Sequence, residues 1–168
     1  KLAIIFMIFL MSLSWAERGF AEQNCPQAAS ATVISLQGNV SFTQNENHSQ
    51  HTAQLNEKLC EGTKIWVKPN SRLSLALPGN DVLRLNENTV LTLKIIDLNK
   101  TSLLDVVKGF IHFISRKPKE VKIESGIANA APLGNEFAFS VDDSRAALWV
   151  YEGGVKFYNQ HGSVNLTS

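Results

Sequence analysis

The sequence has no excess of charge of either sign. Its 168 residues include 16 Lys and Arg against 15 Asp and Glu, a formal net charge of +1. Removal of residues 1–21 would take away Lys1, Glu17 and Arg18 and leave 14 basic against 14 acidic side chains. A neutral domain lacks the positive surface that nucleic acids and anionic lipids attract, so the sequence predicts no nucleic-acid partner.

Cysteine is scarce as well: the chain has only Cys25 and Cys60, and it has no CxxC motif. This excludes a thioredoxin-like redox centre, and two thiols are too few for a zinc site. In an oxidising compartment an even pair of cysteines indicates a disulfide, whereas in a reducing one the two thiols would stay free. We expect a Cys25–Cys60 bond, which would tie the start of the mature chain to the segment around Leu59.

No apolar run is long enough to cross a membrane. Residues 2–15, LAIIFMIFLMSLSW, would form a helix of about 21 Å, while a bilayer core is about 30 Å thick. A basic first residue, a short apolar stretch and small residues at Ala16 and Ala21 are typical of a secretory signal. We therefore expect a signal peptide at residues 1–21 and one exported domain at 22–168, periplasmic or secreted. The alternative is an uncleaved membrane anchor preceded by further sequence.

Sustained helical periodicity is also missing. After Ser30 apolar and polar residues alternate, and turn-forming residues break the alternation about every eight to twelve residues. This pattern predicts an all-β single domain of many short strands, arranged as a solenoid-like β-roll or, alternatively, as a β-sandwich. Residues 101–113, TSLLDVVKGFIHF, are interpreted as two strands around Gly109.

Catalytic and metal-binding motifs are weak. The four histidines lie in separate segments and no serine lies in a nucleophile-elbow motif, so no nucleophilic triad is indicated. Asp142 and Asp143 could act as paired carboxylates on an envelope polysaccharide, but a hairpin turn explains them better. Glu46, His48 and His51 could hold a metal, but a solvated polar loop explains that spacing better. We expect no enzyme activity, no metal and no cofactor.

Two aromatic residues are candidates for contact with a partner. Trp149 and Tyr151 alternate with Leu148 and Val150, so in a strand they lie on the opposite face. On an open face they would suit a sugar or a protein partner. If both faces are covered they belong to the core, and this is the interpretation that we favour from the sequence.

A short basic cluster consists of Arg116, Lys117, Lys119 and Lys122. It could bind a small anion of the citrate or phosphate type, which makes Arg116 and Lys117 candidate binding residues. The favoured interpretation is protection of a sheet edge beside Pro118, because charges on an edge strand discourage pairing with another chain.

Three stretches of the sequence, in order, carry a resemblance to a known family. Residues 59–93 contain a Gly-x-x-Ile turn, a Ser-Arg-x-x-Leu-x-Leu strand and a second leucine strand that leads to Asn88-Thr89. Residues 103–125 contain a leucine strand, a Gly and a Phe-x-x-Arg segment. Residues 129–168 contain a Gly-Asn-Glu-Phe box, an alternating strand and a Glu-Gly-x-Val hairpin. Together these stretches resemble the FecR domain.

The resemblance implies structural roles for the residues of two motifs: Gly134, Asn135, Glu136, Phe137, Glu152 and Gly153. Gly134 would permit a tight or positive-φ backbone before the strand, and the small residues before it would form a loop close to neighbouring backbone. The family commonly has Thr where this chain has Asn135. Asn also tolerates turn geometry, so we expect the fold to be retained; Asn135 lacks the threonine hydroxyl, so a ligand role of that hydroxyl would be lost here.

The chain is most similar to family members with a signal peptide and a Cys-Pro start, here Cys25-Pro26, in which tetratricopeptide repeats often follow. The resemblance implies a non-enzymatic binding or scaffold module that recognises a protein, or a small ligand, at the bacterial cell envelope. In the best-known members this domain meets the signalling region of an outer-membrane receptor, and a cytoplasmic anti-sigma region relays the signal. A membrane-anchored regulator of that type, related to iron uptake, is the alternative.

Overall fold

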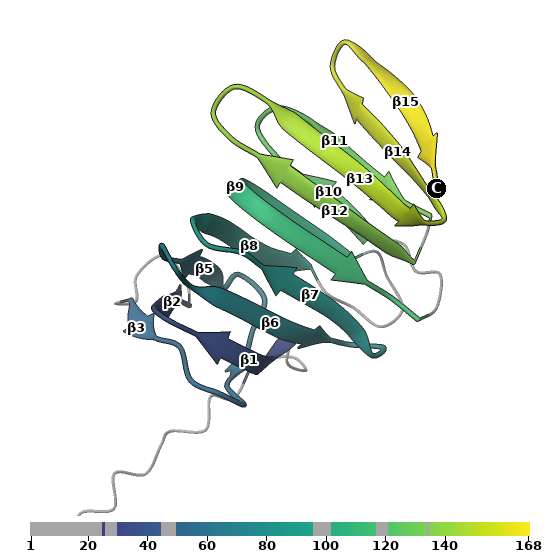
Figure 1. Cartoon of the computed structure of the whole chain (residues 1–168). Coiled ribbons are helices and arrows are strands. Elements are labelled where there is room, and N and C mark those ends of the chain that lie inside the picture. Colours follow the sequence, from purple (N-terminus) through teal and green to yellow (C-terminus); the bar gives the residue numbers. More distant parts are fainter. Residues whose placement is uncertain (1–24, 26–29, 45–49, 96–101, 117–120, 134) are drawn as a thin grey trace, which may run out of the picture.

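The computed structural model describes residues 25, 30–44, 50–95, 102–116, 121–133 and 135–168. Within them the regular elements are all β-strands, and hydrogen bonds join the strands into one continuous sheet (Figure 1). The prediction of an all-β single domain is confirmed. The strands are β1 (Ala31–Gln37), β2 (Val40–Thr43), β3 (His51–Thr52), β4 (Lys58–Leu59), β5 (Lys64–Val67), β6 (Arg72–Leu77), β7 (Asp81–Leu85), β8 (Thr89–Ile95), β9 (Ser102–Ile114), β10 (Val121–Glu124), β11 (Asn129–Pro132), β12 (Glu136–Val141), β13 (Ala146–Glu152), β14 (Gly154–Asn159) and β15 (Gly162–Thr167).

The segment predicted to be a signal peptide, residues 1–21, lies outside the described residues. In the part that the structure describes, no helix is long and apolar enough to cross a membrane.

The continuous sheet folds over so that two layers of strands face each other. Layer A has the strand order β4-β1-β6-β7-β9-β12-β13, and layer B has the order β3-β2-β5-β8-β9-β10-β11-β14-β15. Neighbouring strands are antiparallel, apart from the parallel pair β9 and β10. A sheet rolled over itself corresponds to the predicted β-roll, and its two packed layers are also the defining feature of a sandwich.

Strand β9 belongs to both layers and changes from one to the other at Gly109. Residues 102–108 pair with β8 and β10 in layer B, whereas residues 109–114 pair with β7 and β12 in layer A. Gly109 has φ of 106°, and a Cβ atom there would lie 2.4 Å from the Cα atom of Thr89. The interpretation of residues 101–113 as two strands is therefore wrong: glycine lets one strand bend sharply and pass from the ladders of layer B to those of layer A.

Thr89 fixes the strand just beyond this bend. Its side chain is fully buried, and its Oγ1 atom accepts a hydrogen bond from the Phe110 N–H at 3.1 Å. The same hydroxyl lies 3.2 Å from the Phe110 carbonyl oxygen, to which it donates. The start of β8 is thereby attached to β9 immediately after Gly109.

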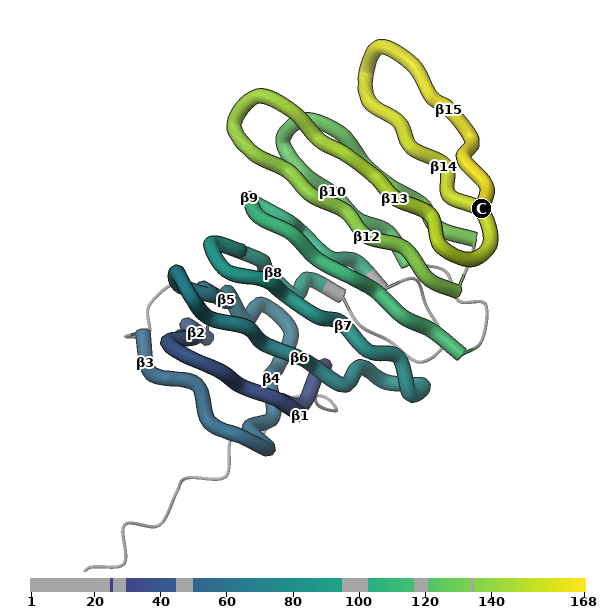
Figure 2. Tube along the Cα trace, viewed as in Figure 1, coloured from purple at the N-terminus to yellow at the C-terminus, as the bar shows by residue number. Residues whose placement is uncertain are grey.

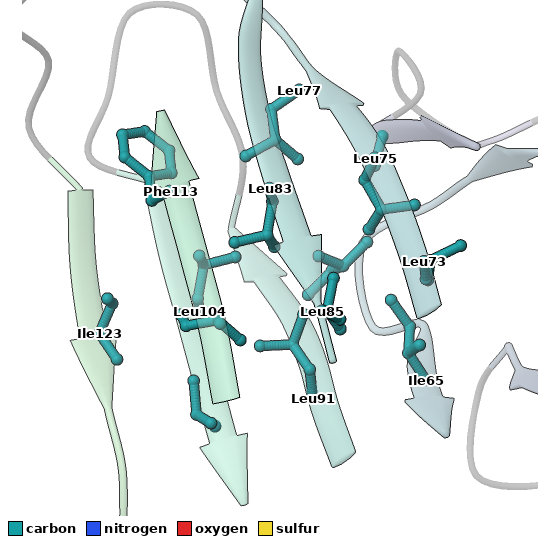
Figure 3. Close-up of a cluster of buried hydrophobic side chains, with 14 of the residues drawn as sticks. Ile65, Leu73, Leu75, Leu77, Leu83, Leu85, Leu91, Leu104, Phe113 and Ile123 are labelled. Carbon is teal, nitrogen blue, oxygen red and sulfur yellow. The ribbon is translucent and has the colours of Figure 1, made fainter. Parts of the chain in front are cut away.

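Leucine, isoleucine and phenylalanine side chains from both layers fill the space between them. On β6, Leu73, Leu75 and Leu77 are at most 5% exposed, while the residues between them face outward. Figure 3 shows them in one cluster with Ile65 and Leu91, which come from the opposite layer. Burial of each such side chain contributes about 1.5–3 kcal/mol to folding, so this core is the main source of stability.

The segment expected to be a loop before Gly134 is partly a strand. Asn129–Pro132 forms β11, which pairs with β10 and β14. Ala130 is fully buried although alanine has low β propensity, because the two neighbouring strands and the core decide its conformation. In β1 a register shift between Val33 and Ser35 interrupts the alternation.

The expected disulfide between Cys25 and Cys60 is present, with the two Cα atoms 5.3 Å apart. Cys60 directly follows β4, the outermost strand of layer A, and it is only 8% exposed. The bond therefore attaches the start of the described chain to the β4 end of the stack of strands.

We expect reduction of this disulfide to lower the free energy of unfolding by about 3–4 kcal/mol, because an open loop of this size gives the unfolded chain more conformational entropy. Urea unfolding with and without dithiothreitol measures the difference. The Cys25→Ser/Cys60→Ser double variant is the control and should unfold at the same urea concentration in both conditions. Equal midpoints for the oxidised and reduced wild type would contradict the prediction.

We expect Gly109→Ala to destabilise the domain by about 2–4 kcal/mol, because a methyl group would overlap Thr89 and the positive φ disfavours alanine. Gly126→Ala is the matched control, since its Cβ would have no atom within 4 Å and should change stability by less than about 0.5 kcal/mol. Urea midpoints of the two variants provide the comparison. An equally small effect at Gly109 would show that the bend tolerates a side chain.

Candidate functional site

The outward face of layer A carries a group of aromatic rings close to its β13 edge. Strands β9, β12 and β13 run side by side there (Figure 2). Their register places Ala138 between His112 on one side and Trp149 on the other. We call the four rings around Ala138 the aromatic face; they belong to Phe110, His112, Trp149 and Tyr151.

The four rings contact one another in pairs across β12. Phe110 and Trp149 have ring centroids 5.9 Å apart at an interplanar angle of 47°. His112 and Tyr151 have centroids 5.6 Å apart and meet edge to face at 70°. Such tilted and edge-to-face contacts hold aromatic side chains in defined positions. The face is therefore a preorganised surface rather than a set of independent side chains.

Exposure separates this face from the core. Ala138 is fully buried although it lies outside the core cluster, as expected if the surrounding rings cover its methyl group. Trp149 is 45% exposed and Tyr151 is 54% exposed. The interpretation of these two residues as core is therefore wrong: layer A has no further layer over its outer side among the described residues, so the rings meet solvent.

Polar side chains lie beside the aromatic face, near the residue at which β12 begins. Glu136 Oε1 lies 2.7 Å from His112 Nε2, and both side chains are partly buried. Asn135 donates from Nδ2 to Glu152 Oε1 at 2.9 Å, and its backbone N–H donates to the Glu152 carbonyl at 3.0 Å. These bonds attach the start of β12 to the neighbouring strands and place two carboxylates beside the rings.

Two further residues of the sequence motifs, Phe137 and Gly153, lie inside and at the end of the same hairpin. Phe137 is fully buried and stacks on Phe113 with centroids 5.2 Å apart. Gly153 has φ of 94° where the chain passes from β13 in layer A to β14 in layer B. Gly134 lies outside the described residues. The structural roles that the resemblance implies for these positions stay predictions.

The hairpin between β12 and β13 ends in a turn organised by Asp142. Its Oδ1 accepts hydrogen bonds from the Ser144 N–H and hydroxyl, both at 2.9 Å, and from the Arg145 N–H at 3.0 Å. Arg145 Nε donates to Oδ2 at 3.1 Å. These bonds, led by the one from the Ser144 N–H, lower the pKa of Asp142 from its ordinary value of 3.8 to about 2. The sequence interpretation of Asp142-Asp143 as a turn is confirmed.

The other candidate sites receive less support. Among the described residues no group of three or more His, Cys, Asp or Glu side chains could hold a metal ion. The His51 Nε2 atom lies 2.6 Å from Glu57 Oε1, while Glu46 and His48 are outside the described residues. In the basic cluster Arg116 is exposed, and Lys117 and Lys119 are outside the described residues, so the anion contact stays a prediction. Lys122 lies on β10 between β9 and β11, so for this residue the interpretation as edge protection is wrong.

Sequence reasoning found Trp149 and Tyr151 but missed Phe110 and His112. The available signal was the alternation of residues 110–113, which places Phe110 and His112 on the face opposite to Ile111 and Phe113. Which strand lies beside β9 depends on long-range pairing, and no local pattern shows that.

The fold and this face define an all-β module with a preformed aromatic surface on one sheet. Residues 63–156 match the model of a protein family described as FecR protein. That match covers more than half of the chain, and the chain belongs to the FecR family.

Solved structures with a similar fold include two crystal structures of a proposed anti-sigma factor from Parabacteroides distasonis. Both have a TM-score of 0.55, with sequence identities of 21% and 20%. In each case the similarity covers 62% of this chain and 50% of the other, so this chain corresponds to about half the length of those proteins. No curated protein matches the sequence.

We expect the turn at the end of the β12–β13 hairpin to lose its Asp142 bonds only in strong acid. Because the folded-state pKa lies below the ordinary value, these bonds stabilise the turn above about pH 4, and this stabilisation is lost as the pH falls through about pH 2. The amide chemical shifts of Ser144 and Arg145, followed by NMR, should move with that low midpoint.

Asp142→Asn should abolish this low-pH movement, whereas Asp143→Asn is the control and should leave it unchanged. A midpoint near the ordinary value of 3.8 in the wild type would contradict the assignment of these bonds.

Proposed function

We propose that this chain is an extracytoplasmic domain of an envelope signalling regulator and that it works by binding a protein partner. Membership of the FecR family carries this proposal, and the fold shared with a proposed anti-sigma factor supports it. In this role residues 1–21 direct export, and the domain faces the periplasm. The domain contributes recognition and no chemical step.

The aromatic face is the proposed contact surface for that partner. Trp and Tyr are enriched among residues that dominate binding energy, since they bury large areas while losing few rotamers. Here the ring contacts hold Trp149 and Tyr151 before any partner arrives, which lowers the entropy lost on binding. Glu136 and Glu152 at the border provide acceptors for polar groups of the partner.

A binding or scaffold module without a signalling output is the second candidate function. It would use the same face, because the surface geometry favours a partner without specifying the cellular response to binding. The two functions differ in their consequence for transcription: a regulator of the anti-sigma type changes the transcript levels of a defined set of genes, whereas a scaffold does not.

We expect Trp149→Ala to abolish signalling in the host, because it removes the largest ring of the aromatic face. A strain in which the gene is deleted is complemented with wild type or variant, and transcript levels are measured by RNA sequencing. The variant should reproduce the transcript changes of the deletion strain while immunoblots show an unchanged amount of protein.

Ile34→Ala is the matched control, because Ile34 is also 45% exposed but lies on β1, near the other end of the same layer. It should restore the wild-type transcript levels. A deletion without effect on transcripts would favour the scaffold function, and full activity of Trp149→Ala would show that the partner binds elsewhere.

A further inference from the structure

On one side of β9 the two layers differ in their number of strands. On the side that includes β1, each layer has four strands beyond β9. On the other side layer A has β12 and β13, whereas layer B has β10, β11, β14 and β15, counted over the described residues. Figure 1 shows β14 and β15 extending past β13 at the end of the stack. Layer B therefore extends beyond layer A at this end, although Phe157 of β14 still contacts Phe139 of β12, with ring centroids 6.4 Å apart.

The exposure of inward side chains follows this imbalance. In the middle of the stack Leu75 and Leu83 are fully buried. On β15 the apolar face continues with Val164 and Leu166, which pair with Phe157 and Val155 of β14, yet Val164 is 49% exposed. A hollow of about 310 Å³ lies beside them, lined in part by Phe157, Val164 and Ala128. The core thus reaches the surface where layer A stops.

Strand β13 presents an unpaired backbone edge at the same place. The Asp142 N–H donates to the Arg145 carbonyl and closes the hairpin, and hydrogen-bonded pairs alternate from there along an antiparallel ladder. The backbone groups of Ala147 and Trp149 consequently face β12. Those of Ala146, Leu148 and Val150 face away from it, and among the described strands β13 pairs with β12 alone.

Apart from a bulge at Tyr151 near its end, this edge lacks the features that usually prevent pairing with another chain. Short strands and charges protect most edges of natural sheets. At the opposite end of the stack β3 and β4 have two residues each, and β4 begins with Lys58. By contrast β13 has seven residues, AALWVYE, without Pro or Gly and with a charge only at its last position.

The charges near the two ends of β13 indicate which kind of segment could pair with this edge. Asp142 and Asp143 lie at one end of β13, and Glu136 and Glu152 lie at the other; Arg145 is bonded to Asp142. If two copies paired β13 with β13 antiparallel, acidic residues would meet acidic residues at both ends. A segment with basic residues at its two ends would instead meet opposite charges.

We propose that β13 is the docking edge for an extended segment of a protein partner, which adds to layer A as its next strand. The segment has alternating apolar residues, whose inward side chains cover the hollow beside Phe157 of β14 and Val164 of β15, and Lys or Arg at both ends. This inference rests on the proposed function that the domain binds a protein, and it adds the mode of binding. Trp149 and Tyr151, which point outward from the same strand, then lie beside the added segment.

The test uses the purified chain to select peptides from a phage-displayed library of random peptides of about twelve residues. The enriched peptides should show alternating apolar residues with basic ends. On binding, NMR should show shifted amides at Ala146, Leu148 and Val150, and these amides should become protected from hydrogen exchange.

Two edge variants locate the binding strand. Ala146→Pro removes an outward N–H without removing a hydrogen bond to β12. It should lower the affinity for the selected peptide at least about tenfold. Ser163→Pro does the same on the free edge of β15, where the β14–β15 register turns the Ser163 N–H outward, and should leave affinity within about twofold. Circular dichroism checks that both variants are folded.

The proposal would be overturned if the library yielded no enriched peptide, or if the bound peptide shifted only the NMR signals of the aromatic rings. It would also be overturned if Ala146→Pro bound the peptide as tightly as the wild type, or if only Ser163→Pro lost binding. A dimer in light scattering that Ala146→Pro dissociates would assign the edge to a second copy. In the transcript assay, a wild-type result for Ala146→Pro together with loss in Trp149→Ala would reject edge docking and retain the proposed function. Wild-type transcript levels in both variants would reject edge docking and the aromatic face as the contact surface.

Discussion

The passage of β9 from one layer to the other at Gly109 is the constraint on which the rest of the structure depends. A side chain at this position would overlap Thr89, and the Thr89 hydroxyl bonds both backbone groups of Phe110 just beyond the bend. Because one strand is shared, the two layers hold a fixed position relative to each other. The leucine core between them can therefore form with a single register, since a slip of one residue would turn its side chains to the wrong face.

The same bend determines where the aromatic face forms. Beyond Gly109, β9 places Phe110 and His112 on the outer side of layer A, and β12 then brings β13 with Trp149 next to them. The inner side chains of these strands, among them Phe113 and Phe137, belong to the core. The candidate site and the core are thus the two faces of the same three strands, and a change in their pairing would alter both.

The sequence was sufficient to predict the strand class, the disulfide, the Asp142 turn and the resemblance to the FecR domain, because each depends on local spacing or on residue type. It was not sufficient to show that residues 101–113 form one bent strand, since the distinction depends on contact with Thr89, outside that segment. It also could not show that Ala130 lies in a strand or that Trp149 is exposed. Both depend on which strands are neighbours, and this information is not present in a local alternation.

The disulfide and the β13 edge lie at opposite ends of layer A. Cys60 follows β4 at the first end, and β13 forms the other. Among the described residues layer A contains seven strands, and neighbouring strands in a sheet are about 4.8 Å apart, so β4 and β13 are separated by about 30 Å. With the proposed docking at β13, the domain would therefore also act as a spacer: Cys25 would be held some 30 Å from the docked segment, a distance close to the thickness of the hydrocarbon core of a bilayer.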